Sequence, residues 1–250
     1  MSDTTSIENS DSPRHAPFVR VTHWITAISF LALLITGIEI MISHPRFYWG
    51  EIGNVQTTPL FQIPIPSSRA MVPTGYGYVL PDQNGWSRYL HFQAAWALVL
   101  TGLAYAIWGL WTGHFRSNLF PAPADRNWTA VWQIIAKHMR FKFSDESEAR
   151  PYNVLQRTAY LVVIFLLFPF VIWTGLAMSP AFNAAFPATV NVLGGRQSAR
   201  TLHFLLSAFL LLFLFIHIAM VALSGFWNRM RAMITGTPPV RQKRLAEERR

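Results

Sequence analysis

Four long apolar stretches constrain the fold of this chain more than any other feature. They cover Val21–Ile42, Tyr89–Trp111, Leu155–Met178 and Thr201–Leu223. Each is long enough for a helix to cross the hydrocarbon core of a bilayer, which takes about 20 residues. Lipid offers no hydrogen bonds to a bare backbone, so such spans form helices. The sequence therefore predicts an all-α membrane protein, a bundle of four transmembrane helices.

The distribution of positive charge predicts how the bundle is oriented. Of the 21 Lys and Arg residues, 16 lie in the N-terminal region, in the segment between the second and third spans, or in the C-terminal region. Cytoplasmic segments are enriched in Lys and Arg, so we expect both termini to be cytoplasmic. The long loop between helices 1 and 2, about Ser43–Arg88, is then an outer loop. The same bias explains the net charge of +9, and we expect no nucleic-acid partner.

The histidines inside the spans are the main candidates for function. Four of the eight lie well within the apolar stretches: His23, His91, His203 and His217. Ionisable side chains at such positions usually face the bundle interior and serve a function. His203 and His217 are separated by close to four helical turns, so they share a face at depths that differ by about 21 Å. With the predicted topology, His91 matches the outer depth of His203 and His23 matches the inner depth of His217.

Two histidines at each depth suit a flat macrocycle held from both faces. Haem iron commonly takes axial histidines, whereas a bare zinc site needs three or four ligands at one level. The chain has no cysteine, which excludes iron–sulfur clusters and covalently attached c-type haem. We therefore expect two non-covalent b haems, one between His91 and His203 and one between His23 and His217.

An arginine precedes three of these histidines by three positions. The segments are RVTH, RYLH and RTLH, and the arginines are Arg20, Arg88 and Arg200. Residues three apart are neighbours on a helix surface, and arginine pairs well with carboxylates. We expect these side chains to contact haem propionates; the alternative is that they anchor the helix ends in the membrane. His44, near the outer end of the first span, is a further candidate for an outer-face site.

These motifs resemble a known family. RVTHW, the following Thr36–Gly37, a histidine opening the second span and the spacing of His203 and His217 are similar to the di-haem b-type cytochrome subunits of nickel–iron hydrogenases, formate dehydrogenases and thiosulfate reductases. The segments HPRFYWGEIGN, YNVLQRTAY, TGLAMSP and GGRQSARTLHF more narrowly resemble thiosulfate-reductase-type cytochrome b proteins, which pair with periplasmic molybdopterin oxidoreductases.

The resemblance implies a function and a domain organisation. It implies a multi-pass protein of the bacterial inner membrane that transfers electrons between membrane quinone and a periplasmic redox partner, with the four histidines as axial ligands of two b haems. Residues 20–233 would form the four-helix di-haem cytochrome b domain, between a polar cytoplasmic tail at 1–19 and a basic cytoplasmic tail at 234–250.

The position of a quinone site and the class of function leave alternatives open. Polar and aromatic residues near the inner histidine pair are candidates for binding quinone, namely Trp24, Gln156, Arg157 and Tyr160; the alternative is an aromatic belt with anchoring arginines. A second function is a free-standing membrane enzyme that oxidises quinol and reduces a small acceptor at the outer haem. A transporter is disfavoured, because the histidines leave the middle of the membrane apolar.

Overall fold

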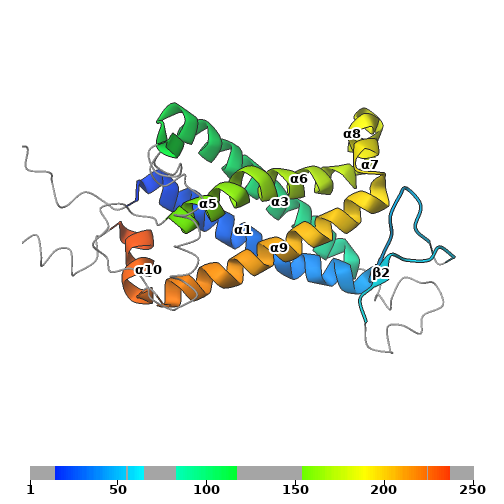
Figure 1. Cartoon of the computed structure of the whole chain (residues 1–250), viewed down its shortest axis with the longest axis horizontal. Helices are drawn as coiled ribbons and strands as arrows, with labels where there is room; N and C mark the ends of the chain where they lie inside the picture. Colours follow the sequence, from blue (N-terminus) through cyan, green and yellow to red (C-terminus); the bar gives the residue numbers. More distant parts are fainter. Residues whose placement is uncertain (1–14, 55, 65–82, 117–153, 224, 237–250) are drawn as a thin grey trace, which may run out of the picture.

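Four long helical spans run side by side in the computed structural model, which describes residues 15–54, 56–64, 83–116, 154–223 and 225–236 (Figure 1). They are α1 (Pro17–Ser43), α3 (Gln83–Trp111), a composite third span and α9 (Arg196–Leu223). All four are long and apolar enough to cross a membrane. The prediction of a four-helix membrane bundle is confirmed.

The bundle has two ends with different surroundings. One end, here called the loop end, carries β1 (Arg46–Phe47), β2 (Phe61–Gln62), α7 (Pro180–Ala185) and α8 (Pro187–Val192) (Figure 1). The other, the terminal end, carries the start of α1 and the short helix α10 (Phe226–Thr235). By the predicted topology, the loop end is the outer face.

The third span contains a wide helical turn. It is built from α5 (Val154–Val162), the π-helical turn η3 (Val163–Leu167) and α6 (Phe168–Ala177). Pro169 lies two residues after the end of the π turn, so the carbonyl four positions before it, that of Phe165, is within the turn. A proline ring clashes with the carbonyl four residues earlier in a regular α-helix, and a π turn is one of the irregularities that relieve such a conflict.

The start of α9 is capped by the loop that follows α1. The N–H of Arg196 donates to Glu51 Oε2 at 2.8 Å, and the next two amides of α9 donate to the Gly50 carbonyl at 3.0 and 3.1 Å. These amides have no partner within their own helix. At Gly195, whose φ is 105°, a Cβ atom would lie 2.8 Å from the Gly50 carbonyl carbon, so this close approach requires glycine. The described start of the loop between α1 and α3 is thus fixed on α9.

A two-stranded ribbon lies in the described part of the loop between α1 and α3. β1 and β2 are antiparallel, with Phe47 opposite Phe61 and their rings stacked at 4.8 Å. Phe47 also packs against Phe204 of α9, with ring centroids 4.5 Å apart. This aromatic contact covers α9 one residue beyond His203.

The four spans associate as two helix pairs. α1 packs closely along α3, and α6 packs along α9, while close backbone approaches between the two pairs are sparse. The candidate functional side chains project between these pairs.

Candidate functional site

The structure brings the four histidines of the spans together as two pairs. At the loop end, the ring centroids of His91 on α3 and His203 on α9 are 6.3 Å apart. At the terminal end, those of His23 on α1 and His217 on α9 are 6.4 Å apart. These are the pairs that the depth argument predicted, and α9 supplies one member of each.

The separation of the rings fits two imidazoles that share one metal ion. A bond from a metal to an imidazole nitrogen is about 2 Å, and the ring centre lies roughly a further 1.1 Å away, so two axial imidazoles have centroids about 6.3 Å apart. Within the described ranges, no group of three or more His, Asp or Glu side chains could hold a metal ion. Each level therefore offers two candidate ligands, the number that a six-coordinate haem iron takes from the protein.

Hydrogen bonds orient the loop-end imidazoles. Nδ1 of His91 lies 2.9 Å from Thr36 Oγ1. Nδ1 of His203 lies 3.0 Å from the Val171 carbonyl and 3.2 Å from Thr174 Oγ1. With Nδ1 engaged in both rings, Nε2 is the nitrogen that can bind a metal, an arrangement typical of metal-ligating histidine.

The terminal-end imidazoles lie mainly among aromatic rings. His217 stacks on Phe213 with centroids 5.8 Å apart, and Tyr160 approaches it edge-on at 6.5 Å. His23 meets the neighbouring Trp24 edge-on at 5.3 Å. The Nδ1 atom of His23 is buried and has no hydrogen-bond partner among the described residues. His23 therefore lacks the Nδ1 hydrogen bond that orients each of the loop-end imidazoles.

Positive charge gathers beside the loop-end pair, around His44. Arg88 Nη2 lies 3.4 Å from His44 Nε2. Arg200 Nη2 donates to the His44 carbonyl and to the Arg46 carbonyl, the latter at 3.0 Å. Burial and the Arg200 and Arg88 guanidiniums lower the pKa of His44 to about 4. Such an environment favours an anionic group, and haem propionates are carboxylates that would suit it.

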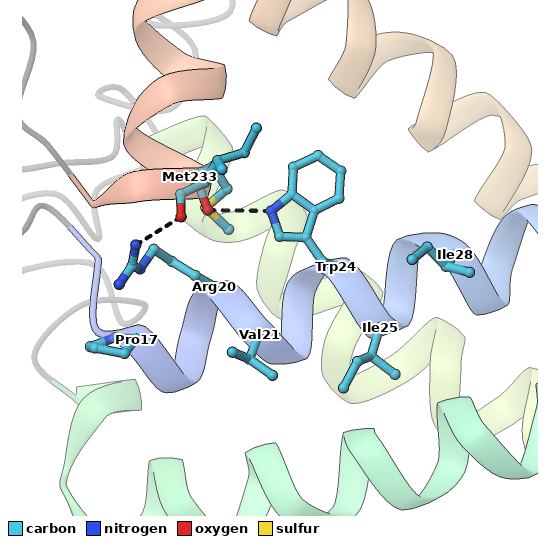
Figure 2. A pocket seen from close by; sticks show the side chains of 8 residues that line it. Pro17, Arg20, Val21, Trp24, Ile25, Ile28 and Met233 are labelled. Atoms are coloured by element: carbon cyan, nitrogen blue, oxygen red, sulfur yellow. Dashed lines mark hydrogen bonds between the residues drawn. The ribbon is translucent and has the colours of Figure 1, made fainter.

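Arg20 and Trp24 tie α1 to α10 at the terminal end (Figure 2). Arg20 Nη1 donates to the Ile234 carbonyl at 3.0 Å, and Trp24 Nε1 donates to the Met233 carbonyl at 3.3 Å. An open groove of about 370 Å³ runs beside these contacts, lined by Pro17, Arg20, Val21, Trp24, Ile25, Ile28, Met233 and Ile234. Indole has a single N–H donor, so Trp24 can offer a further ligand only its ring.

The structure describes the side chains of two of the four candidates for binding quinone. Tyr160 lies beside His217, and Trp24 lies beside His23. Gln156 and Arg157 belong to α5, but their side chains fall outside the described part of the chain. The structure thus places one aromatic candidate next to each member of the terminal-end pair.

Sequence reasoning missed Thr36 and Thr174 as partners of the histidines. Both threonines are fully buried, and both precede a glycine, in Thr36–Gly37 and Thr174–Gly175. The Thr–Gly dipeptide occurs six times in the chain, so it did not single out these two threonines. Each contacts a histidine on a different helix, 55 residues away for Thr36 and 29 for Thr174.

Comparison with known proteins gives a consistent result. The sequence model of a family described as prokaryotic cytochrome b561 matches residues 14–236. The chain is similar to a putative protein-methionine-sulfoxide reductase subunit, YedZ1, of Azospira oryzae, with 28% identity over 89% of this chain and 96% of the relative. It is also similar to a probable Ni/Fe-hydrogenase B-type cytochrome subunit of Cupriavidus necator, with 26% identity over 80% of this chain and 74% of that one.

Proposed function

This chain belongs to the prokaryotic cytochrome b561 family, and on that premise we propose that it carries electrons between membrane quinone and a redox enzyme at the loop end. Family membership and four spans make it a multi-pass protein of the bacterial inner membrane and a b-type cytochrome of electron transfer. The quinone, the enzyme and the number of haems are the parts that we propose.

The observation that carries the proposal is the pair of histidine pairs at two depths. We propose His91 and His203 as the axial ligands of one b haem, and His23 and His217 as those of a second. Ring separations of 6.3 and 6.4 Å support this assignment. A bound haem would supply reversible one-electron redox chemistry, and the chain would hold two of them through His203 and His217, which lie about 21 Å apart along α9.

The charged groups beside each pair have proposed roles in binding the haems. Arg88 and Arg200 lie one helical turn from His91 and His203, next to His44, where two propionates would meet positive charge. Arg20 lies one helical turn before His23, as Arg88 does before His91. Its Nη1 donates to the Ile234 carbonyl of α10. Its buried Nε has no partner among the described residues, so Arg20 retains a donor for a propionate.

The redox enzyme is proposed to dock at the loop end. The relatives are named as subunits of a methionine-sulfoxide reductase and of hydrogenases, so an oxidoreductase partner is in keeping with the family. We propose a periplasmic molybdopterin oxidoreductase, which follows from the resemblance of HPRFYWGEIGN and GGRQSARTLHF to thiosulfate-reductase-type cytochromes. Both segments lie in the α9 cap, where Glu51 and Gly50 bind the start of α9.

Quinone is proposed to bind at the terminal end. Electrons that enter at the loop end cross the membrane only if the second reactant is at the other end of the chain of haems. Tyr160 and the Trp24 ring lie beside His217 and His23 there. The groove between α1 and α10 is largely lined by apolar side chains, as an isoprenoid quinone requires (Figure 2).

The test is purification from native membranes in mild detergent. We expect two b haems per chain in a pyridine haemochrome assay and a redox enzyme that co-purifies with the chain. One haem per chain, or a c-type spectrum, would contradict the pairing of the histidines.

The alternative function predicts a different outcome of the same purification. A free-standing quinol-oxidising enzyme would purify alone and would reduce a small acceptor with quinol as the electron donor. The Arg88 and Arg200 guanidiniums next to His44 at the loop end favour an anionic acceptor in that case.

A further inference from the structure

Each of the two loop-end imidazoles packs against a Thr–Gly dipeptide on a neighbouring helix. We call each dipeptide a notch. Thr36 and Gly37 of α1 face His91, and Thr174 and Gly175 of α6 face His203. A Cβ atom added at Gly37 would lie 3.6 Å from Cε1 of His91, and one added at Gly175 would lie 3.2 Å from Cε1 of His203. In both notches the threonine contacts Nδ1 and the glycine lies beside Cε1, and at Gly175 the approach is close enough to favour glycine.

The hydrogen bonds of the threonines determine which nitrogen carries the proton. A threonine hydroxyl has one hydrogen. Thr36 Oγ1 donates it to the Ala32 carbonyl at 2.7 Å. Its oxygen therefore acts as acceptor toward His91, so Nδ1 of His91 carries the proton and Nε2 keeps its lone pair.

The hydroxyl of Thr174 at the second notch is used in the same way. Thr174 Oγ1 lies 3.0 Å from both the Phe170 and the Val171 carbonyls, to which it donates. Its oxygen then accepts from Nδ1 of His203, which also donates to the Val171 carbonyl at 3.0 Å. Both rings of the pair are thus held in the tautomer that presents Nε2 toward the space between them.

We propose that Thr36–Gly37 and Thr174–Gly175 are a matched pair of positioning elements that fix the tautomer and position of the loop-end ligands and thereby lower the reduction potential of the haem they hold. The proposal rests on the proposed function, because it takes His91 and His203 as axial ligands. An acceptor on Nδ1–H makes the imidazole a more basic ligand, and a more basic ligand favours the ferric state. His23, whose Nδ1 is buried without a partner among the described residues, lacks such a notch.

The two glycines differ in how closely the histidine ring approaches them. A contact of 3.6 Å is ordinary, so Gly37→Ala leaves His91 in place. A contact of 3.2 Å is tighter than most real Cβ contacts, so Gly175→Ala pushes His203 away from α6. We expect Gly175→Ala to lose part of the loop-end haem and Gly37→Ala to retain it.

The decisive experiment replaces the threonine oxygens while keeping their shape. Thr36→Val, Thr174→Val and the double variant are purified as the full chain and titrated potentiometrically, with both haems followed by their spectra. The matched control is Thr22→Val, because Thr22 is also buried on α1 and donates to the Phe18 carbonyl at 2.9 Å, yet makes its hydrogen bonds to backbone carbonyls alone. Thr36→Ser and Thr174→Ser keep the hydroxyl and serve as rescue variants.

The expected result is an upward shift in the midpoint potential of one haem, the one that His203→Ala removes. The shift is larger in the double variant, and it is absent in the serine variants and in Thr22→Val. Loss of that haem in the valine variants, with retention in the serine variants, also supports the positioning role. Unchanged potentials in all three valine variants, or equal shifts of both haems, would overturn the proposal. A wild-type chain that binds no haem would instead overturn the proposed function.

Discussion

The two histidine pairs have nearly the same ring separation but different surroundings. At the loop end, hydrogen bonds from Nδ1 to Thr36, Thr174 and the Val171 carbonyl fix each ring. At the terminal end, the rings lie among Trp24, Phe213 and Tyr160. One helix can therefore supply a histidine to each of two pairs, while its neighbours decide how strongly each ring is oriented. We expect the loop-end haem to be the one of lower potential, because its ligands are the more basic.

The largest expected effect comes from removing one histidine of either pair. His203→Ala should abolish the loop-end haem and leave the terminal-end haem in place, and His217→Ala should do the reverse. The two ligands are separated by about 21 Å along α9, so each site should lose its haem independently. Haem content by pyridine haemochrome, together with the spectrum of the remaining haem, measures this. If either variant inserts and folds but has lost both haems, the two sites are not independent.

The aromatic surroundings of the terminal-end pair give a second way to separate the ends. Tyr160→Phe and Trp24→Leu should slow the reduction of the haems by quinol several-fold, and should leave their chemical reduction by dithionite unchanged. The physical reason is proximity, because both side chains lie beside His217 or His23. Leu100→Ala, on the exposed face of α3, is the matched control. Wild-type rates of quinol oxidation in both variants would move the quinone site away from this end.

Removing positive charge at the loop end should change the reduction potential of the loop-end haem by a smaller amount. Arg200→Ala removes a cation one helical turn from His203, and a cation beside a propionate favours the reduced haem. The potential of the loop-end haem should fall by on the order of tens of millivolts, given the weak effective interaction of charges near a protein surface. Arg200→Lys keeps the charge and should lie between the two. A redox titration in which only the terminal-end haem changes would assign Arg200 to capping the loop, through its bonds to the His44 and Arg46 carbonyls.

The sequence predicted the spans from apolar length, and the histidine pairing from the depth of each histidine in its span under the predicted topology. Apolar length located the four spans, and the spacing of His203 and His217 placed them on one face of α9. The helix ends were less accurate: α9 begins at Arg196 rather than Thr201. Hydropathy marks where apolar residues stop, whereas a helix continues wherever its amides find acceptors, as α9 does in Glu51 and Gly50.

Contacts between distant segments could not be predicted from local pattern. Thr36 and Thr174 became partners of the loop-end histidines only through the packing of α1 on α3 and of α6 on α9. The bonds from Arg20 and Trp24 to the last turn of α10 depend in the same way on how the chain returns to its own start. A side chain that donates to a backbone carbonyl leaves no compositional signal in either segment.

The smallest expected effect is a dependence of loop-end stability on pH. It follows from comparing two histidines outside the spans, one at each end. The pKa of His44 at the loop end is lowered to about 4 by burial and by the Arg200 and Arg88 guanidiniums. The pKa of His114 at the terminal end is lowered by burial alone. Well above pH 6.5, both imidazoles are neutral whether the surrounding segment is folded or open. As the pH falls from 6.5 toward 4, an open loop end binds a proton at His44 that the packed form does not, so the packed form loses stability.

Hydrogen exchange measures this difference directly. After correction for the intrinsic pH dependence of exchange, the amides of Gln197 and Ser198, which donate to the Gly50 carbonyl, should lose protection between pH 6.5 and 4. His44→Gln cannot bind that proton, so the pH dependence should flatten in this variant while the protection at pH 7 is kept. The effect should be measured with haem bound and with haem removed. A propionate near Arg88 and Arg200 would add negative charge beside His44, raise its pKa and narrow the pH range over which protection is lost. Equal pH dependence in wild type and His44→Gln would show that His44 does not link acid to the packing of the loop end.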